Sequence, residues 1–159
     1  MSADLDQKWM QYALELASRA EQQGEVPVGA VIVANDQVLG EGWNQSISLN
    51  DPTAHAEVIA LRSAAQQIQN YRLPAESTLY VSLEPCPMCA GAMVHARIGR
   101  LVYGASDPRT GAAGSVFQIA SNEKLNHRME VQSGVLEAEC ASLLRDFFRV
   151  RRNSSSPSN

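Results

Sequence analysis

The sequence predicts an α/β fold, a three-layer α/β/α sandwich around one mixed five-stranded sheet. Apolar residues recur along the 159-residue chain with alternating helical and strand periods. Helical segments separate most of the strand-like runs, which favours layers of helices on a sheet. With 45% apolar and 19% charged residues, the composition is that of a folded globular domain. We assign residues 1–152 to a single domain and residues 153–159 to a disordered polar tail.

Each expected element follows from apolar spacing and from turn signals. The first helix has an apolar stripe on one face and ends near Gly24. Asn35-Asp36 separates the first two β-rich runs and favours an antiparallel hairpin. The expected elements are, in order, helix 6–22, strands 28–34 and 37–44, helix 54–68, strand 78–83, a helix ending near residue 97, strands 100–105 and 129–132, and a terminal helix.

Two short motifs carry the strongest functional signal, His55-Ala56-Glu57 and Pro85-Cys86-Pro87-Met88-Cys89. One imidazole and two thiolates supply three ligands to a tetrahedral Zn²⁺ and leave its fourth position to water, which is typical of catalytic zinc sites. The two cysteines are three residues apart, so one helical turn can direct both sulfur atoms at one ion. The predicted zinc ligands are His55, Cys86 and Cys89.

Glu57 is predicted to be the catalytic residue and not a ligand. Water activated by zinc needs a carboxylate that accepts its proton and passes it to a leaving group. A helix-start signal accompanies each ligand segment, Asp51-Pro52 before the histidine and Pro87 after Cys86. Two helix N-termini should therefore converge on the metal, and their partial positive charge favours thiolates.

The same residues allow other interpretations. A Cys-x-x-Cys motif alone also occurs in redox dithiols, and His-x-Glu alone occurs by chance in helices. A non-catalytic zinc module would need a fourth ligand. His95 is expected on the cysteine helix away from the metal, and His127 in a loop, exposed or in contact with the substrate. Cys140 lies on a helical apolar stripe and is expected to be buried.

Several longer motifs resemble one enzyme family. Besides the two metal segments, they are Glu25-Val26-Pro27-Val28-Gly29-Ala30, Gly42-Trp43-Asn44, Leu83-Glu84-Pro85-Cys86, Cys89-Ala90-Gly91-Ala92-Met93 and Thr110-Gly111-Ala112-Ala113-Gly114-Ser115. From about residue 5 to residue 152 the chain resembles bacterial tRNA-specific adenosine deaminases of the zinc-dependent cytidine deaminase superfamily. The resemblance implies a cytidine deaminase-like fold, one Zn²⁺ per subunit and a homodimer. It also implies hydrolytic deamination of the wobble adenosine in a tRNA anticodon loop to inosine, with release of ammonia.

The resemblance further implies which residues meet the substrate. Asn44 should hydrogen-bond the target nucleoside, Val28 and Ala56 should form part of the base pocket, and Asp107 should meet the neighbouring ribose-phosphate. Judged from the residues alone, Asn44 at a strand end and Asp107 before a proline are also typical of turns. The alternative function is a guanine or cytosine deaminase of the same superfamily, which would share the zinc residues but need no RNA-binding tail.

Positive charge is concentrated near the end of the chain. The net charge is −4, so general attraction to RNA is not expected, but residues 145–152 carry a local charge of +3. Arginines flank Phe147 and Phe148 there, a combination that can bind phosphates and stack on unpaired bases. The residues predicted to contact a tRNA anticodon stem-loop are Phe147, Phe148, Arg149, Arg151 and Arg152. The alternative is a helix with buried phenylalanines and solvated arginines.

Composition also indicates the cellular compartment in which the protein is expected. No apolar run approaches the length of a membrane span, and the acidic residues Asp4 and Asp6 make the N-terminus unlike a secretory signal. Three cysteines, two of them in the metal motif, do not suggest a disulfide framework. We therefore expect a cytoplasmic enzyme with neither a membrane nor DNA as its partner.

Overall fold

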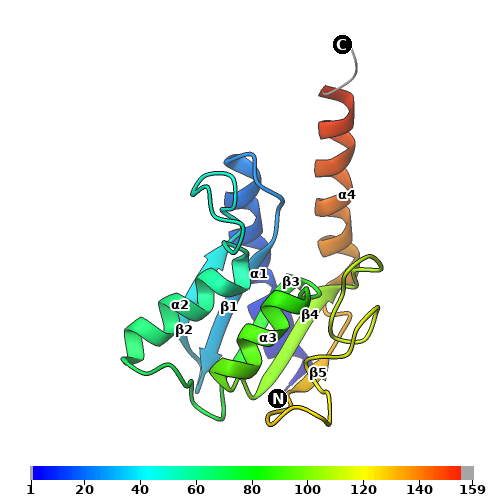
Figure 1. Cartoon of the computed structure of the whole chain (residues 1–159). Helices are drawn as coiled ribbons and strands as arrows, with labels where there is room; N and C mark the ends of the chain where they lie inside the picture. Colours follow the sequence, from blue (N-terminus) through cyan, green and yellow to red (C-terminus); the bar gives the residue numbers. More distant parts are fainter. Residues whose placement is uncertain (1, 155–159) are drawn as a thin grey trace.

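The computed structural model describes residues 2–154, in which four helices and five strands form one unit (Figure 1). The order is α1 (Ala3–Gln22), β1 (Gly29–Ala34), β2 (Gln37–Trp43), α2 (Ala56–Ile68), β3 (Thr78–Leu83), α3 (Pro87–Ala96), β4 (Arg100–Ala105), β5 (Glu130–Gln132) and α4 (Glu137–Ser154). Every predicted element is present. Helix α4 includes the first two residues of the predicted tail, and residues 155–159 lie outside the described residues. Between residues 2 and 154 no helix combines the length and apolarity needed to cross a lipid bilayer.

The strands form one mixed sheet in the order β2-β1-β3-β4-β5. Strand β1 pairs antiparallel with β2 and β3, whereas β3 with β4 and β4 with β5 are parallel. Asn35 and Asp36 turn the β1–β2 hairpin with φ values of 51° and 60°, the left-handed conformation that two-residue hairpin turns use. The predicted five-stranded mixed sheet and its first hairpin are confirmed.

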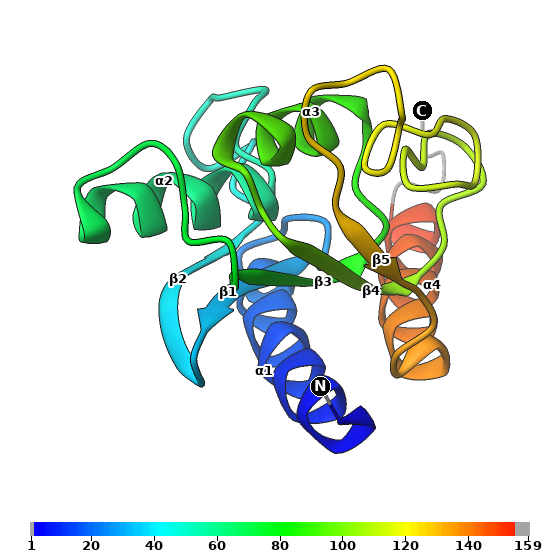
Figure 2. The ribbon, with the colours of Figure 1, turned by 90° about the horizontal axis from the view of Figure 1, so that it is seen from below.

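Helices cover both faces of this sheet, so the predicted three layers are confirmed. Helices α2 and α3 lie on one face, and α1 and α4 lie on the other (Figure 2). Alternate side chains of β1 serve the two faces. Ala30 and Ile32 belong to the apolar core under α2 and α3, whereas Val31 and Val33 belong to the core under α1. Each fully buried side chain of valine or isoleucine size contributes about 1.5–3 kcal/mol.

Helix α2 packs on β2 through a glycine–alanine seam, which consists of Gly40, Gly42, Ala56, Ala60 and Ala64. A Cβ atom at Gly42 would lie 2.6 Å from the carbonyl oxygen of Ala56, and one at Gly40 would lie 2.6 Å from the carbonyl oxygen of Ala60. These separations are shorter than a non-bonded contact, so only glycine fits at the two strand positions. The seam thereby fixes the position of α2 on the sheet.

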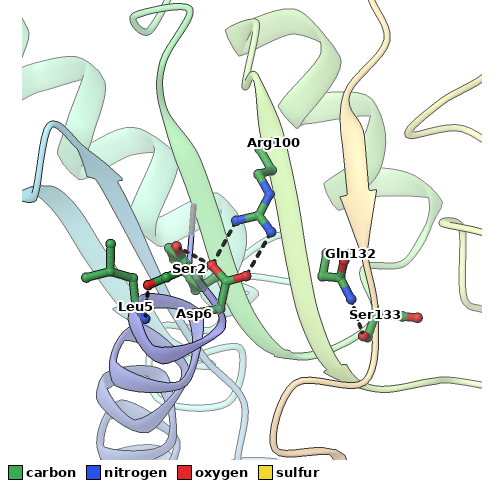
Figure 3. A network of polar contacts seen from close by, with 7 residues as sticks. Ser2, Leu5, Asp6, Arg100, Gln132 and Ser133 are labelled. Atoms are coloured by element: carbon green, nitrogen blue, oxygen red, sulfur yellow. Dashed lines mark hydrogen bonds and ion pairs between the residues drawn. The ribbon is translucent and has the colours of Figure 1, made fainter.

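A buried ion pair fastens α1 to the end of the sheet where β4 begins. Asp6 is 5% exposed and accepts two hydrogen bonds of 2.8 Å from the Arg100 guanidinium (Figure 3). The Tyr80 hydroxyl donates a third, of 2.9 Å. The Arg100 hydrogen bonds are the main reason that the pKa of Asp6 lies below its ordinary value of 3.8, although burial opposes them. The positive charge of Arg100 is thus neutralised by the carboxylate of Asp6.

Candidate metal centre and substrate groove

The first residues of helices α2 and α3 meet just beyond the end of β3. His55 is the N-cap of α2, and Cys86 is the N-cap of α3, where Pro87 occupies the first turn. His55 Nδ1 lies 3.6 Å from Cys86 Sγ and 3.5 Å from Cys89 Sγ. The two helix N-termini therefore converge on one point, as the sequence predicts.

The start of α2 differs from the prediction. The sequence predicts a helix-start signal at Asp51-Pro52 and a helix from residue 54, but α2 begins at Ala56. Asp51 Oδ1 instead accepts hydrogen bonds from the backbone N–H (2.9 Å) and hydroxyl (2.7 Å) of Thr53, which close a local turn. At the true helix start, Asn44 Oδ1 accepts a hydrogen bond of 2.8 Å from the N–H of Ala56. The prediction was wrong because an aspartate that closes a turn and one that caps a helix look alike in sequence.

The donor set fits a zinc ion. One donor atom each from His55, Cys86 and Cys89 lies within 4.8 Å of the others. In a tetrahedral site with ordinary Zn–N and Zn–S bond lengths, neighbouring ligand atoms are about 3.6 Å apart. The two N–S distances measured here match that separation. Two thiols and one imidazole are also a donor set found in catalytic zinc sites.

A buried carboxyl group lies beside this cluster. Glu57, in the first turn of α2, is 4% exposed, and burial raises its pKa to about 7. The hydrogen bond between the two thiols lowers the pKa of Cys86 to about 4 and raises that of Cys89. Three groups that can become anions thus share one small volume with a single imidazole. A divalent cation would offset the charge of the two thiolates.

Hydrogen bonds link Asn44, predicted to bind the nucleoside, to Val28 and Ala56, predicted to form part of the base pocket. The N–H of Asn44 donates to the carbonyl of Val28 over 3.2 Å, and its side chain caps the N–H of Ala56. The side chains of Val28 and Ala56 are buried in the apolar core under α2 and α3. Asn44 therefore has a structural role, because it holds the helix that carries Glu57.

A groove of about 680 Å³ lies between the loop after β4 and helix α4. Asp107 lines it from the loop, and Phe148 and Arg152 line it from the helix. The Asp107 carboxylate accepts hydrogen bonds from the N–H groups of Arg109 (2.9 Å) and Thr110 (3.3 Å), so it also shapes its own turn. The structure thus brings Asp107 and part of the predicted RNA-contacting segment to one surface.

The predicted contact residues of α4 do not all share that surface. This helix extends well beyond the sheet (Figure 1). Phe148 is 43% exposed and lines the groove. Phe147 lines a separate pocket of about 510 Å³ beside the end of α1, and Arg151 lies 5.2 Å above its ring while also reaching the groove. Arg149 forms an exposed ion pair with Asp146, 3.0 Å long.

The remaining histidines and the third cysteine lie apart from the cluster. His95 is on α3, and the metal-binding group found within residues 2–154 contains neither it nor His127. His127 lies in a loop but is half-buried, and its Nε2 is 2.6 Å from the carbonyl oxygen of Ile98, so the expected exposure was wrong. Cys140 is buried, as predicted.

Sequence reasoning missed two buried carboxylates near the site. Glu25 is 2% exposed and accepts hydrogen bonds from the N–H of Ile47 (3.1 Å) and from the N–H and hydroxyl of Ser48 (both 2.7 Å). Glu84 is also 2% exposed and holds the loop that contains Asp107. A charged residue inside a largely apolar motif was the only signal for either role.

Three comparisons relate the chain to known proteins. The family described as the cytidine and deoxycytidylate deaminase zinc-binding region matches residues 3–105. A tRNA-specific adenosine deaminase of Haemophilus influenzae is 60% identical over 151 residues, which cover 94% of this chain and 87% of the relative. A structure from studies of A-to-I editing by tRNA:A34 deaminases at the wobble position is 44% identical, with a TM-score of 0.82, and the match covers 86% of this chain and 99% of that one. A guanine deaminase from Nitrosomonas europaea is 26% identical, with a TM-score of 0.72, and covers 89% of this chain and 83% of that one.

Proposed function

This chain belongs to the zinc-binding cytidine and deoxycytidylate deaminase family, and we propose that it is a tRNA adenosine deaminase. The reaction is hydrolytic conversion of the wobble adenosine in an anticodon loop to inosine, with release of ammonia. One observation carries the proposal: a His-Cys-Cys group with the spacing of a zinc site lies beside a buried glutamate. This arrangement occurs on a fold shared with tRNA:A34 deaminases.

His55, Cys86 and Cys89 would hold the metal, with one zinc ion per subunit. When bound, zinc supplies a Lewis acid that lowers the pKa of water towards neutrality. The three side chains approach from two helix N-termini, whose dipoles stabilise the thiolate form of the cysteines.

Glu57 would move the protons of the reaction. Its carboxylate would accept one proton from water and deliver it to the ring nitrogen next to C6. It would then accept the second proton of that water, from the hydroxyl group now on C6, and pass it to the amine, which leaves as ammonia while the C6 carbonyl forms. A group that transfers protons in both directions works best when its pKa is near the working pH. Burial moves the pKa of Glu57 in that direction.

Asn44 and Asp107 would position the nucleotide. The Oδ1 atom of Asn44 already accepts a hydrogen bond from the N–H of Ala56. The NH₂ group of Asn44 would therefore donate a hydrogen bond to the nucleoside. Val28 and Ala56 would provide the apolar wall behind the base. Asp107 would meet the ribose-phosphate where it lines the groove.

Helix α4 would bind the anticodon stem-loop. In this loop the target base is already unpaired, so extruding it costs little. Phe148 offers a ring for stacking next to Asp107, and the helix end carries the local positive charge. Replacing Arg149, Arg151 and Arg152 together with alanine should weaken binding. It should also make the slope of log affinity against log salt concentration shallower, by roughly one for each phosphate that the variant no longer neutralises. A salt dependence equal to that of the unaltered protein would contradict this role.

We also infer that the enzyme is a homodimer, the assembly that its family resemblance implies. Because bacterial tRNA is a cytoplasmic molecule, the proposed substrate implies a cytoplasmic location. Sedimentation velocity at assay concentrations tests the dimer, and a single species with the mass of one chain would contradict it.

One assay tests the reaction and its alternative. The zinc-loaded protein is incubated separately with an anticodon stem-loop that contains wobble adenosine, with free guanine and with free cytidine, and the products are identified by mass spectrometry. We expect inosine in the RNA. Xanthine as the only product would instead support a guanine deaminase, and uridine alone would support a cytidine-type enzyme.

A further inference from the structure

The carboxylate of Glu84 is a hub for the loop that follows β4. It accepts hydrogen bonds from the N–H of Asp107 (3.0 Å), the N–H of Ala113 (3.0 Å) and the N–H of Ser115 (3.1 Å). The hydroxyl of Ser115 donates a fourth. All four donors are neutral and come from one loop. The buried charge of Glu84 is therefore stabilised only as long as that loop keeps its conformation.

The loop fits closely around this carboxylate. At Gly111 a Cβ atom would lie 2.4 Å from Glu84 Oε1, so a larger residue fits there only if the carboxylate is displaced. The backbone adds two further ties, from the N–H of Glu84 to the carbonyl of Ala105 and from the N–H of Ala112 to the carbonyl of Pro85, each 2.8 Å long. Residues 105–115 are thus fastened to the segment that leads into α3.

Glu84 connects two parts of the site that are distant in sequence. Two residues after it, Cys86 begins the helix with the candidate metal ligands. Its hydrogen bond to the N–H of Asp107 fixes the backbone of the residue that lines the groove. The Glu84 side chain, together with the two backbone ties, therefore links the metal centre to the groove wall.

We propose that Glu84 is a positioning residue, which sets Asp107 and the groove wall at the correct distance from the metal-bearing helix α3. The assignment rests on the proposed function in so far as Asp107 meets the RNA. Glu84 itself does not contact the substrate, because it is enclosed by the loop that it orders.

The direct test is Glu84→Gln. The variant keeps the size of the side chain, but its NH₂ group faces backbone N–H donors and cannot accept their hydrogen bonds. Amide hydrogen exchange measured by mass spectrometry should show faster exchange in residues 105–115, with zinc content and exchange in α1 unchanged. This measurement needs no RNA, so it is informative even if the protein proves inactive on the stem-loop, an outcome that would defeat only the proposed function.

Kinetics then separate positioning from a general loss of structure. A shift of about 1 Å at a binding group can cost on the order of 100-fold in rate constants. We expect kcat/KM on the stem-loop to fall about 10- to 100-fold, mainly through KM. If Glu84 acts through Asp107, the double variant Glu84→Gln with Asp107→Ala should be no worse than the more damaged single variant.

Glu25→Gln is the matched control. Glu25 is equally buried and also accepts hydrogen bonds from a loop, but that loop lies after β2. The loss of kcat/KM that it causes should multiply with the loss caused by Asp107→Ala.

Gly111→Ala is the second variant, in case Glu84→Gln fails to fold. It displaces the same carboxylate while the charge of Glu84 is retained, and it should likewise raise KM. Unchanged exchange in residues 105–115, or multiplicative losses with Asp107→Ala, would overturn the proposal.

Discussion

The two ends of the parallel β3–β4 pair each contain a buried carboxyl group, in opposite electrostatic settings. Where β4 begins, Asp6 is matched by Arg100 and Tyr80, and hydrogen bonds from Arg100 hold its pKa below the ordinary value. Beyond the other end, burial next to two thiols raises the pKa of Glu57 to about 7. A carboxyl whose charge the protein itself neutralises stabilises the fold, whereas one without a cationic partner, such as Glu57, can exchange a proton near neutral pH.

The largest effect should follow from Glu57→Ala. The change removes the proton carrier but retains His55, Cys86 and Cys89, so zinc should stay bound. Turnover should fall by about 10²- to 10⁴-fold, the range that general acid–base groups contribute. Single-turnover rates on the stem-loop and metal analysis of the same sample check this. Full activity in a variant that retains zinc would refute the role of Glu57.

Asp6→Asn should damage stability and spare chemistry. The substitution leaves the Arg100 guanidinium without its counter-charge, and breaking a buried pair in this way costs about 3 kcal/mol. Urea unfolding measures the loss, and kcat is compared at a temperature where both proteins are folded. Replacing both partners, with Asp6→Asn and Arg100→Met, should cost less than the single change. If kcat of Asp6→Asn fell as far as that of Glu57→Ala, Asp6 would not be a purely structural carboxylate.

Low pH should remove the contribution of Asp6 to the free energy of unfolding. Its folded-state pKa lies below the ordinary 3.8, so the stabilisation is complete above the unfolded-state pKa and is lost as the pH falls through the folded-state value. The difference in unfolding free energy between the unaltered protein and Asp6→Asn should therefore be constant from about pH 7 to pH 5 and shrink below about pH 4. A difference that persists undiminished to about pH 2 would contradict the ion pair.

The smallest effect should come from an exposed carboxylate. Asp36 lies 3.6 Å from Lys8, and both side chains are more than half exposed. Asp36→Asn keeps a residue that tolerates the left-handed turn conformation, and it should change the unfolding free energy by less than about 0.5 kcal/mol. Thermal melts at low and high salt provide the check. A loss as large as that of Asp6→Asn would mean that burial is not what separates these carboxylates.

The order of the elements could be predicted because apolar period and turn residues are local signals. The metal group could be predicted for the same reason, since Cys86 and Cys89 are one turn apart and both ligand segments are short motifs. The role of Glu84 could not, because its donors lie 23 to 31 positions further along the chain. Nor could the sequence separate Phe147 from Phe148, since their surroundings depend on how α4 leaves the sheet.

The start of α2 shows a different limit. Asp51 and Asn44 both have side chains that can accept a hydrogen bond from a first-turn N–H, and only the path of residues 44–55 decides that Asn44 does so, at Ala56. A pattern of neighbouring residues therefore locates the helix but not the residue that begins it.

The glycine–alanine seam has a consequence for how such an enzyme could acquire a new substrate. Since Gly40 and Gly42 cannot accept even one methyl group, the helix that carries Glu57 is held by positions that tolerate almost no variation. The loops after β2 and β4 lie at the surface and, apart from tightly packed positions such as Gly111, tolerate more variation. Descendants of this chain that favour another nucleobase should therefore inherit the seam unaltered and differ in those two loops.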